Sequence, residues 1–83
     1  MVEQRRAQRD RVLKAGTIEF GGGAMDCIIR NISNFGAVLE VVSLVGIPEN
    51  FTLVIPTDRV RHQCSLVWRS ERRIGLVFEL APP

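Results

Sequence analysis

The sequence predicts an all-β fold, a small six-stranded antiparallel β-barrel with a flexible basic N-terminal arm. Three observations support this prediction. Apolar and polar residues alternate along several short runs, which is the period of strands buried on one face. Glycine, proline and asparagine separate these runs at short intervals, and Val, Ile, Leu and Phe supply most of the apolar residues. Because the edges of an open sheet invite aggregation, closure into a barrel is expected.

The chain is expected to fold as one domain. It has 83 residues, of which 46% are hydrophobic, so it can build a core without metal or disulfide support. Residues 1–10 are polar and charged without a core-facing pattern and are expected to form the arm, while residues 11–83 form the barrel. The net charge is only +2, but basic residues crowd into the first fourteen positions.

Strands and turns are expected to alternate along the barrel. Gly16 is expected at a bulge or bend inside the first strand. The expected order is strand 11–20, a glycine turn at 21–23, strand 24–31, a turn at 31–36, strand 37–42, a loop at 43–50, strand 51–55, a turn at 57–58, strand 59–69 and strand 73–80.

Four residues on inward-facing positions need separate interpretation. Cys27 and Cys64 lie in apolar runs without C-x-x-C spacing, so they are expected to be buried reduced thiols rather than zinc ligands or a disulfide. His62 and Trp68 share the apolar face of the strand over 59–69. We therefore expect Trp68 in the core and His62 as a satisfied, buried histidine rather than a catalytic one.

Two short motifs contain the residues best suited to ligand binding. The first is R-x-x-x-R, with Arg5 and Arg9 in the arm. The second is N-x-S-x-x-G, with Asn31, Ser33 and Gly36 at the turn after the second strand. Guanine offers O6 and N7 to a guanidinium fork, and phosphate accepts from Arg, from Ser and from N–H groups in a turn. This set of residues therefore indicates a ligand with guanine edges and phosphates.

Each motif also has a purely structural explanation. A basic arm is often only a solvated run of charge, and Asn, Ser and Gly are common turn residues for backbone reasons. The two motifs are more informative together, because the start of one hairpin strand lies beside the end of the next. The arm is therefore expected to leave the barrel beside the 31–36 turn, so that both motifs can face one ligand.

The combination resembles the PilZ domain, the bacterial receptor module for the second messenger cyclic di-guanosine monophosphate (c-di-GMP). The signature of that family is R-x-x-x-R followed by D/N-x-S-x-x-G at about this separation, and both motifs are intact here. Val67-Trp68-Arg69 and Gly75-Leu76-Val77-Phe78 are softer matches that resemble the closing hairpin of the family. The resemblance covers essentially the whole chain and implies a PilZ-like barrel of the split-barrel type.

The resemblance implies a role for each motif residue. Arg5 and Arg9 would grip guanine edges and phosphates, and a guanidinium plane can also stack on a base. Asn31 would hydrogen-bond a guanine edge, and Ser33 would contact a phosphate or base. Gly36 would permit the turn and a close approach of the backbone.

Three further cations are ligand candidates. Arg6 lies inside the first motif and would add charge or a stacking plane, and Arg11 and Arg30 are secondary candidates. A bidentate Arg–guanine contact is worth about 1–3 kcal/mol, whereas fixing one backbone residue costs about 1–2 kcal/mol. We therefore expect the arm to be mobile without ligand and ordered with it.

The chain is expected to be a binding domain rather than an enzyme. It shows no catalytic triad pattern, no paired catalytic carboxylates and no metal-ligand spacing, so no catalytic residue, metal or cofactor is expected. The expected ligand is c-di-GMP, and the expected output is a contact with an unidentified downstream protein. A charged N-terminus and the lack of a long apolar run predict a cytoplasmic location without membrane insertion.

Two other functions stay open from the sequence. The first is a degenerate PilZ-like adaptor that binds a protein and no nucleotide. The second is a small barrel for single-stranded nucleic acid, which needs exposed aromatics on a basic groove. Aromatics are few and tyrosine is absent, so no DNA or RNA partner is expected.

Overall fold

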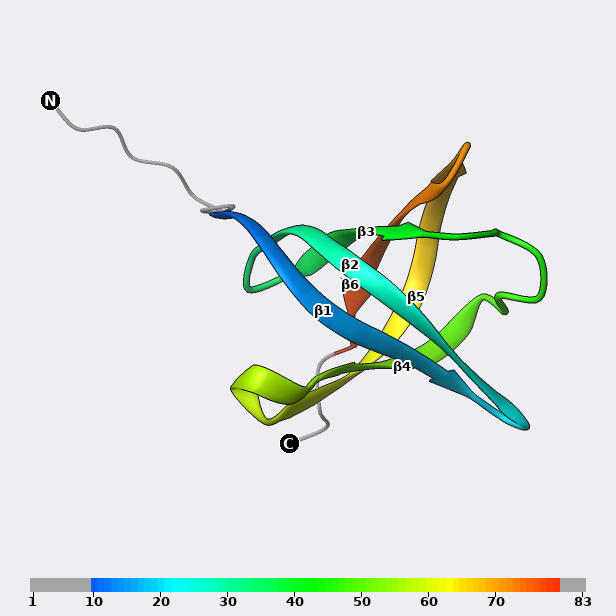
Figure 1. Ribbon diagram of the computed structural model, residues 1–83, viewed down its shortest axis with the longest axis horizontal. Coiled ribbons are helices and arrows are strands. Elements are labelled where there is room, and N and C mark those ends of the chain that lie inside the picture. Colours follow the sequence, from blue (N-terminus) through cyan, green and yellow to red (C-terminus); the bar gives the residue numbers. More distant parts are fainter. Residues whose placement is uncertain (1–9, 80–83) are drawn as a thin grey trace, which may run out of the picture.

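A computed structural model describes residues 10–79 of the chain, and within this range six strands close into a β-barrel (Figure 1). The strand order around the barrel is β1-β2-β3-β6-β5-β4, and all neighbours are antiparallel. The predicted all-β, six-stranded antiparallel barrel is confirmed. The elements are β1 (Asp10–Phe20), β2 (Gly23–Ile32), β3 (Gly36–Val41), β4 (Asn50–Ile55), the 3-10 turn η1 (Pro56–Asp58), β5 (Val60–Ser70) and β6 (Arg73–Phe78).

The barrel interior is filled by the inward positions of all six strands. Alternation along each strand sends aliphatic side chains inward, where burial removes their apolar surface from water. The fully buried side chains are Ile18, Ile29, Leu39, Leu53, Ile55, Ile74 and Cys64. Both cysteines are free and buried, as predicted, and burial raises the pKa of Cys27 to about 12 and that of Cys64 to about 11.

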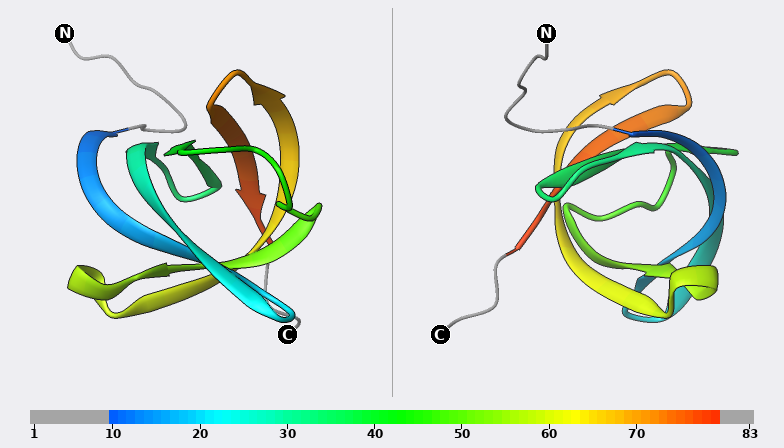
Figure 2. Two further views of the ribbon diagram at one scale, coloured as in Figure 1. Left: turned by 45° about the vertical axis from the view of Figure 1, so that its right-hand side comes forward. Right: turned by 90° about the vertical axis from the view of Figure 1, so that its left-hand side faces the viewer.

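The long axis of the barrel separates two ends (Figure 1). We call one the η1 end, because η1 lies there with the start of β1 and the β2–β3 turn. The other is the hairpin end, where the β1–β2 turn, the β3–β4 loop and the β5–β6 turn lie (Figures 1 and 2). In the loop at the hairpin end, Ile47 is buried and Leu44 packs against the core.

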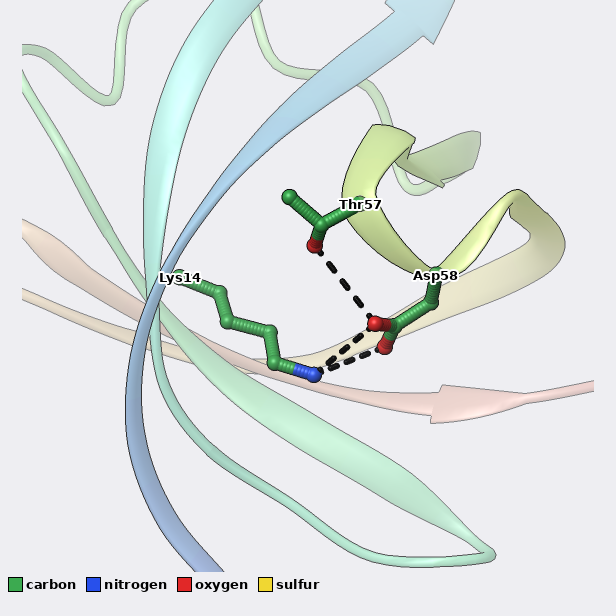
Figure 3. A network of polar contacts seen from close by, with 3 residues as sticks. All are labelled: Lys14, Thr57 and Asp58. Carbon is green, nitrogen blue, oxygen red and sulfur yellow. Dashed lines mark hydrogen bonds and ion pairs between the residues drawn. The ribbon is translucent and has the colours of Figure 1, made fainter.

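An ion pair joins β1 to η1 at the η1 end. Backbone pairing between β1 and β4 spans Thr17–Glu19 on the β1 side. Beyond that point, Lys14 Nζ donates to both carboxylate oxygens of Asp58, at 2.8 and 3.1 Å (Figure 3). Thr57 Oγ1 also donates to Asp58 Oδ1 at 3.5 Å. The side chains of Lys14 and Asp58 thus bridge the two elements where the strand ladder has ended.

The predicted bulge at Gly16 is wrong. The register of β1 against β2 shifts between Arg11 and Lys14, and Gly16 pairs regularly with Cys27. A Cβ at Gly16 would lie 3.1 Å from Ile29 Cδ1 and 3.2 Å from Cys27 Sγ. The glycine is therefore explained by crowding in the barrel interior rather than by a bend of the backbone.

The predicted core position of Trp68 is also wrong. The register of β5 against β6 shifts between Leu66 and Trp68, and an extra residue in one strand turns the side chains that follow it to the other face. Trp68 is 43% exposed, and its indole lies over Gly75, its partner on β6, where a Cβ would overlap Trp68 Nε1. Trp68 therefore belongs to the outer face of the barrel.

His62 is half-buried and stacks on an aromatic ring. Its imidazole lies parallel to the ring of Phe78, with centroids 4.0 Å apart and an interplanar angle of 11°. The ends of the strands also differ from the prediction, by one or two residues each, and Asp10, expected in the arm, is the first residue of β1. Asn31 and Ile32 belong to β2 rather than to a turn, and β6 ends at Phe78 rather than at residue 80, which lies outside the described residues.

Candidate functional site

The second sequence motif forms a tight, serine-bonded turn between β2 and β3. Ser33 Oγ accepts hydrogen bonds from the backbone N–H groups of Phe35 (3.0 Å) and Gly36 (3.3 Å). Ser33 N–H donates to the carbonyl of Gly36 at 2.8 Å, and its hydroxyl points to the same oxygen at 3.4 Å. The acceptor capacity of this hydroxyl is therefore used by the turn, and its proton is held only by a long hydrogen bond.

Gly36 is required by a close approach of two strands. Its backbone does not have a positive φ, in contrast to Gly22 and Gly46. A Cβ at Gly36 would overlap the carbonyl oxygen of Leu76 on β6 and lie 3.1 Å from Val77 Cα. The glycine thus allows β6 to approach the start of β3 closely, which fixes the position of the turn.

The beginning of β1 lies beside this turn. Asp10 pairs with Ile32, and Arg11 pairs with Asn31. The expected neighbourhood of the first strand and the second motif is therefore present in the backbone. Arg5, Arg6 and Arg9 lie outside the described residues, and for Arg11 the structure describes the backbone alone.

Asn31 belongs to a row of paired residues that runs across four strands on the outer face. It pairs with Val38 on β3, Val38 pairs with Gly75 on β6, and Gly75 pairs with Trp68 on β5. Since neighbouring strands lie about 4.8 Å apart, Trp68 lies three strand spacings, about 14 Å, from Asn31 across the sheet. Trp68 was not predicted as a site residue, because only the bulge at Val67 turns it outward.

Arg30 is already bound to a carboxylate. Its Nη1 lies 3.2 Å from Glu40 Oε1, and the same oxygen lies 3.7 Å from Arg73 Nη2. The β2–β3 register shifts between Ile29 and Asn31, so Arg30 sits at a bulge. Both side chains are more than one third exposed, so the ion pair is a surface one, but Glu40 still neutralises the charge of Arg30 on this face. Arg30 is therefore a weaker ligand candidate than the sequence suggested.

Taken together, the described geometry defines a small antiparallel barrel with a polar turn and an exposed tryptophan on one continuous outer face. In a comparison with protein-family models, residues 3–83 match the PilZ domain, and the chain belongs to that family. The family is one of c-di-GMP receptors, and its domains act as ligand-binding or adaptor modules.

A comparison with curated proteins found no match. Within residues 10–79, no helix has the length and apolar character that a bilayer span requires. In the same part of the chain, no three His, Cys, Asp or Glu side chains gather where they could hold a metal ion.

Proposed function

We propose that the chain is a c-di-GMP receptor that orders its N-terminal arm on ligand binding and thereby signals to a partner protein. The register of β1 against β2 carries this proposal, because it sets Asp10 opposite Ile32, next to the N-x-S-x-x-G turn. Arg9 directly precedes Asp10 in the chain. The R-x-x-x-R motif is therefore attached within one residue of the turn, and a short arm is enough for it to close over a ligand there.

The proposed roles follow the chemistry of each group. Arg5 and Arg9 grip guanine edges and phosphates, with Arg6 adding charge. Asn31 hydrogen-bonds a guanine edge from the outer face, and the hydroxyl proton of Ser33 turns from its long bond to a phosphate oxygen. In the same row, Trp68 offers an exposed indole on which a base can stack.

Isothermal titration calorimetry with c-di-GMP tests the proposal directly. Truncating Arg9 removes one bidentate contact, worth about 1–3 kcal/mol, so Arg9→Ala should weaken binding at least about fivefold. Arg72→Ala is the matched control, because Arg72 is an exposed arginine on the β5–β6 turn at the other end of the barrel. Absence of binding by the unmodified chain, or an Arg9→Ala affinity equal to that of the control, contradicts the assignment.

Hydrogen exchange tests the switch. Two bidentate arginine contacts supply roughly what it costs to order a few arm residues, at about 1–2 kcal/mol each. The amides of residues 2–10 should therefore gain protection when c-di-GMP is added. Equal protection with and without the nucleotide rules out arm ordering as the output signal.

A protein adaptor is the second candidate, and exposed apolar residues favour it. Val67 is 60% exposed, Val77 43% and Trp68 43%, and all three lie on the neighbouring strands β5 and β6. Contiguous apolar surface of this kind is typical of protein contacts. A folded chain that shows no heat with c-di-GMP would favour this function. For either candidate we infer a cytoplasmic location, since two buried free thiols suit a reducing compartment.

A further inference from the structure

A groove of about 500 Å³ opens at the η1 end of the barrel. Ser33 and Asn34 of the β2–β3 turn line one side, and Asp58 of η1 lines another. The remaining lining residues are Ile32, Ile55, Val60, His62 and Phe78. The groove therefore shares the Ser33 turn with the outer face that carries Asn31.

The walls of this groove suit a flat, partly apolar ring. Ile55 is fully buried at its base, and the parallel pair of His62 and Phe78 gives an aromatic wall with centroids 4.0 Å apart. Its volume falls within the range of small-molecule sites, which combine apolar and aromatic walls with a few polar groups. Proteins that bind an unstacked base use the same combination, with stacking walls and hydrogen bonds to the Watson–Crick edge.

Asp58 supplies the hydrogen-bond acceptors that distinguish one base from another. Lys14 Nζ donates to both of its carboxylate oxygens, which fixes the orientation of the carboxylate (Figure 3). Each oxygen retains lone pairs for a second donor. Guanine presents N1–H and its 2-amino group side by side, a donor pair that adenine lacks, and this pair matches the two oxygens of a carboxylate.

We propose that this groove receives one guanine of c-di-GMP, with Asp58 accepting hydrogen bonds from N1–H and the 2-amino group. Lys14 acts as a positioning residue for Asp58. The ligand then straddles the Ser33 turn, with one base in the groove and the other on the outer face near Asn31. This inference rests on the proposed function, because it assumes that c-di-GMP is the ligand.

A two-by-two titration tests the groove. The chain and its Asp58→Asn variant are each titrated with c-di-GMP and with the cyclic di-inosine analogue, which lacks the 2-amino groups. The unmodified chain should bind c-di-GMP about tenfold more tightly than the analogue. Asp58→Asn should bind c-di-GMP more weakly and lose most of its preference over the analogue, because the carboxylate that reads the amino group in the groove is gone.

Two further variants separate hydrogen bonding from stability. Asp26→Asn makes the same chemical change at an exposed carboxylate on β2 and should behave like the unmodified chain. Lys14→Met removes the ion pair but keeps the carboxylate, so it should retain the preference for c-di-GMP at reduced affinity. Lys14→Arg should restore the affinity, which a loss caused by misfolding alone would not explain.

The outcomes for the two proposals are distinct. If the unmodified chain binds neither nucleotide, the proposed function fails and the groove assignment fails with it. If the chain binds c-di-GMP but Asp58→Asn keeps the full preference over the analogue, the groove assignment fails and the receptor function stands. Nuclear Overhauser contacts between guanine H8 and the Phe78 ring would support the assignment, and contacts from both bases to Trp68 alone would overturn it.

Discussion

Replacing Gly36 with alanine should destabilise the barrel strongly. The new Cβ would overlap the carbonyl oxygen of Leu76 and lie 3.1 Å from Val77 Cα, and both are backbone atoms that cannot rotate away. Strand β6 must therefore move from β3, which strains the hydrogen bond from Phe78 N–H to the Phe35 carbonyl, now 2.8 Å long.

The size of this effect follows from the two contributions. Overpacking costs about 1–3 kcal/mol, and a weakened backbone hydrogen bond adds about 0.5–1.5 kcal/mol. A total loss of about 2–4 kcal/mol in the free energy of unfolding corresponds to a fall in Tm of roughly 10–25 °C for a domain of this size.

Thermal and urea unfolding followed by circular dichroism measure this loss. Gly21→Ala is the matched control, because a Cβ there meets no atom within 4 Å and its φ is not positive, so its Tm should stay close to that of the unmodified chain. A Gly36→Ala variant as stable as the Gly21→Ala variant would refute the argument that the close approach of β6 to β3 requires this glycine. In that case any loss of c-di-GMP affinity in the Gly36→Ala variant would reflect a change in the binding site and not a loss of folded protein.

Four other outcomes are expected. Gly75→Ala should displace the Trp68 indole, increase its exposure and shift its fluorescence to longer wavelength; an unchanged emission spectrum would contradict the packing described. Lys14→Met should cost at most about 1 kcal/mol in urea unfolding, because its ion pair with Asp58 is over one third exposed. The thiols of Cys27 and Cys64 should resist thiol reagents at pH 8 in the native state. Burial raises the pKa of both thiols above the ordinary 9.0, so above pH 9 the folded state holds more protons than the unfolded state. The free energy of unfolding should therefore fall as the pH rises from 9 towards about 11–12. A free energy of unfolding that stays constant over this pH range would contradict the prediction.

The strands and their buried faces could be predicted because their signal is local. Along β3 and β4, period-2 alternation alone assigns Leu39 and Leu53 to the interior, and both are fully buried. The glycine turn before β2 was equally readable, since Gly22 adopts φ +86°.

The bulges could not be predicted because they depend on the partner strand. A register shift is a property of two strands, so neither the shift before Lys14 nor the one before Trp68 leaves a mark in its own run of residues. The role of Gly36 could be predicted only in part, for the same reason. Its motif indicated a turn, but the atoms that exclude a side chain belong to Leu76, forty residues later in the chain.

The candidate site shows the same division. Sequence spacing indicated that the arm and the Ser33 turn are neighbours, and the pairing of Asp10 with Ile32 agrees with this. The ion pair of Arg30 with Glu40 depends on the bulge in the β2–β3 pairing, and the groove beside Asp58 arises from segments that only barrel closure brings together. Tertiary contacts of this kind have no counterpart in a local motif.

The short ladder between β1 and β4 has a consequence for how the barrel forms. It joins Thr17–Glu19 to Thr52–Val54, so it closes the longest loop of any strand pair among the described residues except β3–β6. Closing such a loop costs more chain entropy than forming the β1–β2 or β5–β6 hairpin. Because only three residue pairs form this ladder, the β1–β4 pairing should form last during folding and open first in thermal fluctuations. Strand β1, which forms one side of this seam, continues into the N-terminal arm. Under the proposed function, nucleotide binding would therefore act next to the strand pair that opens most easily.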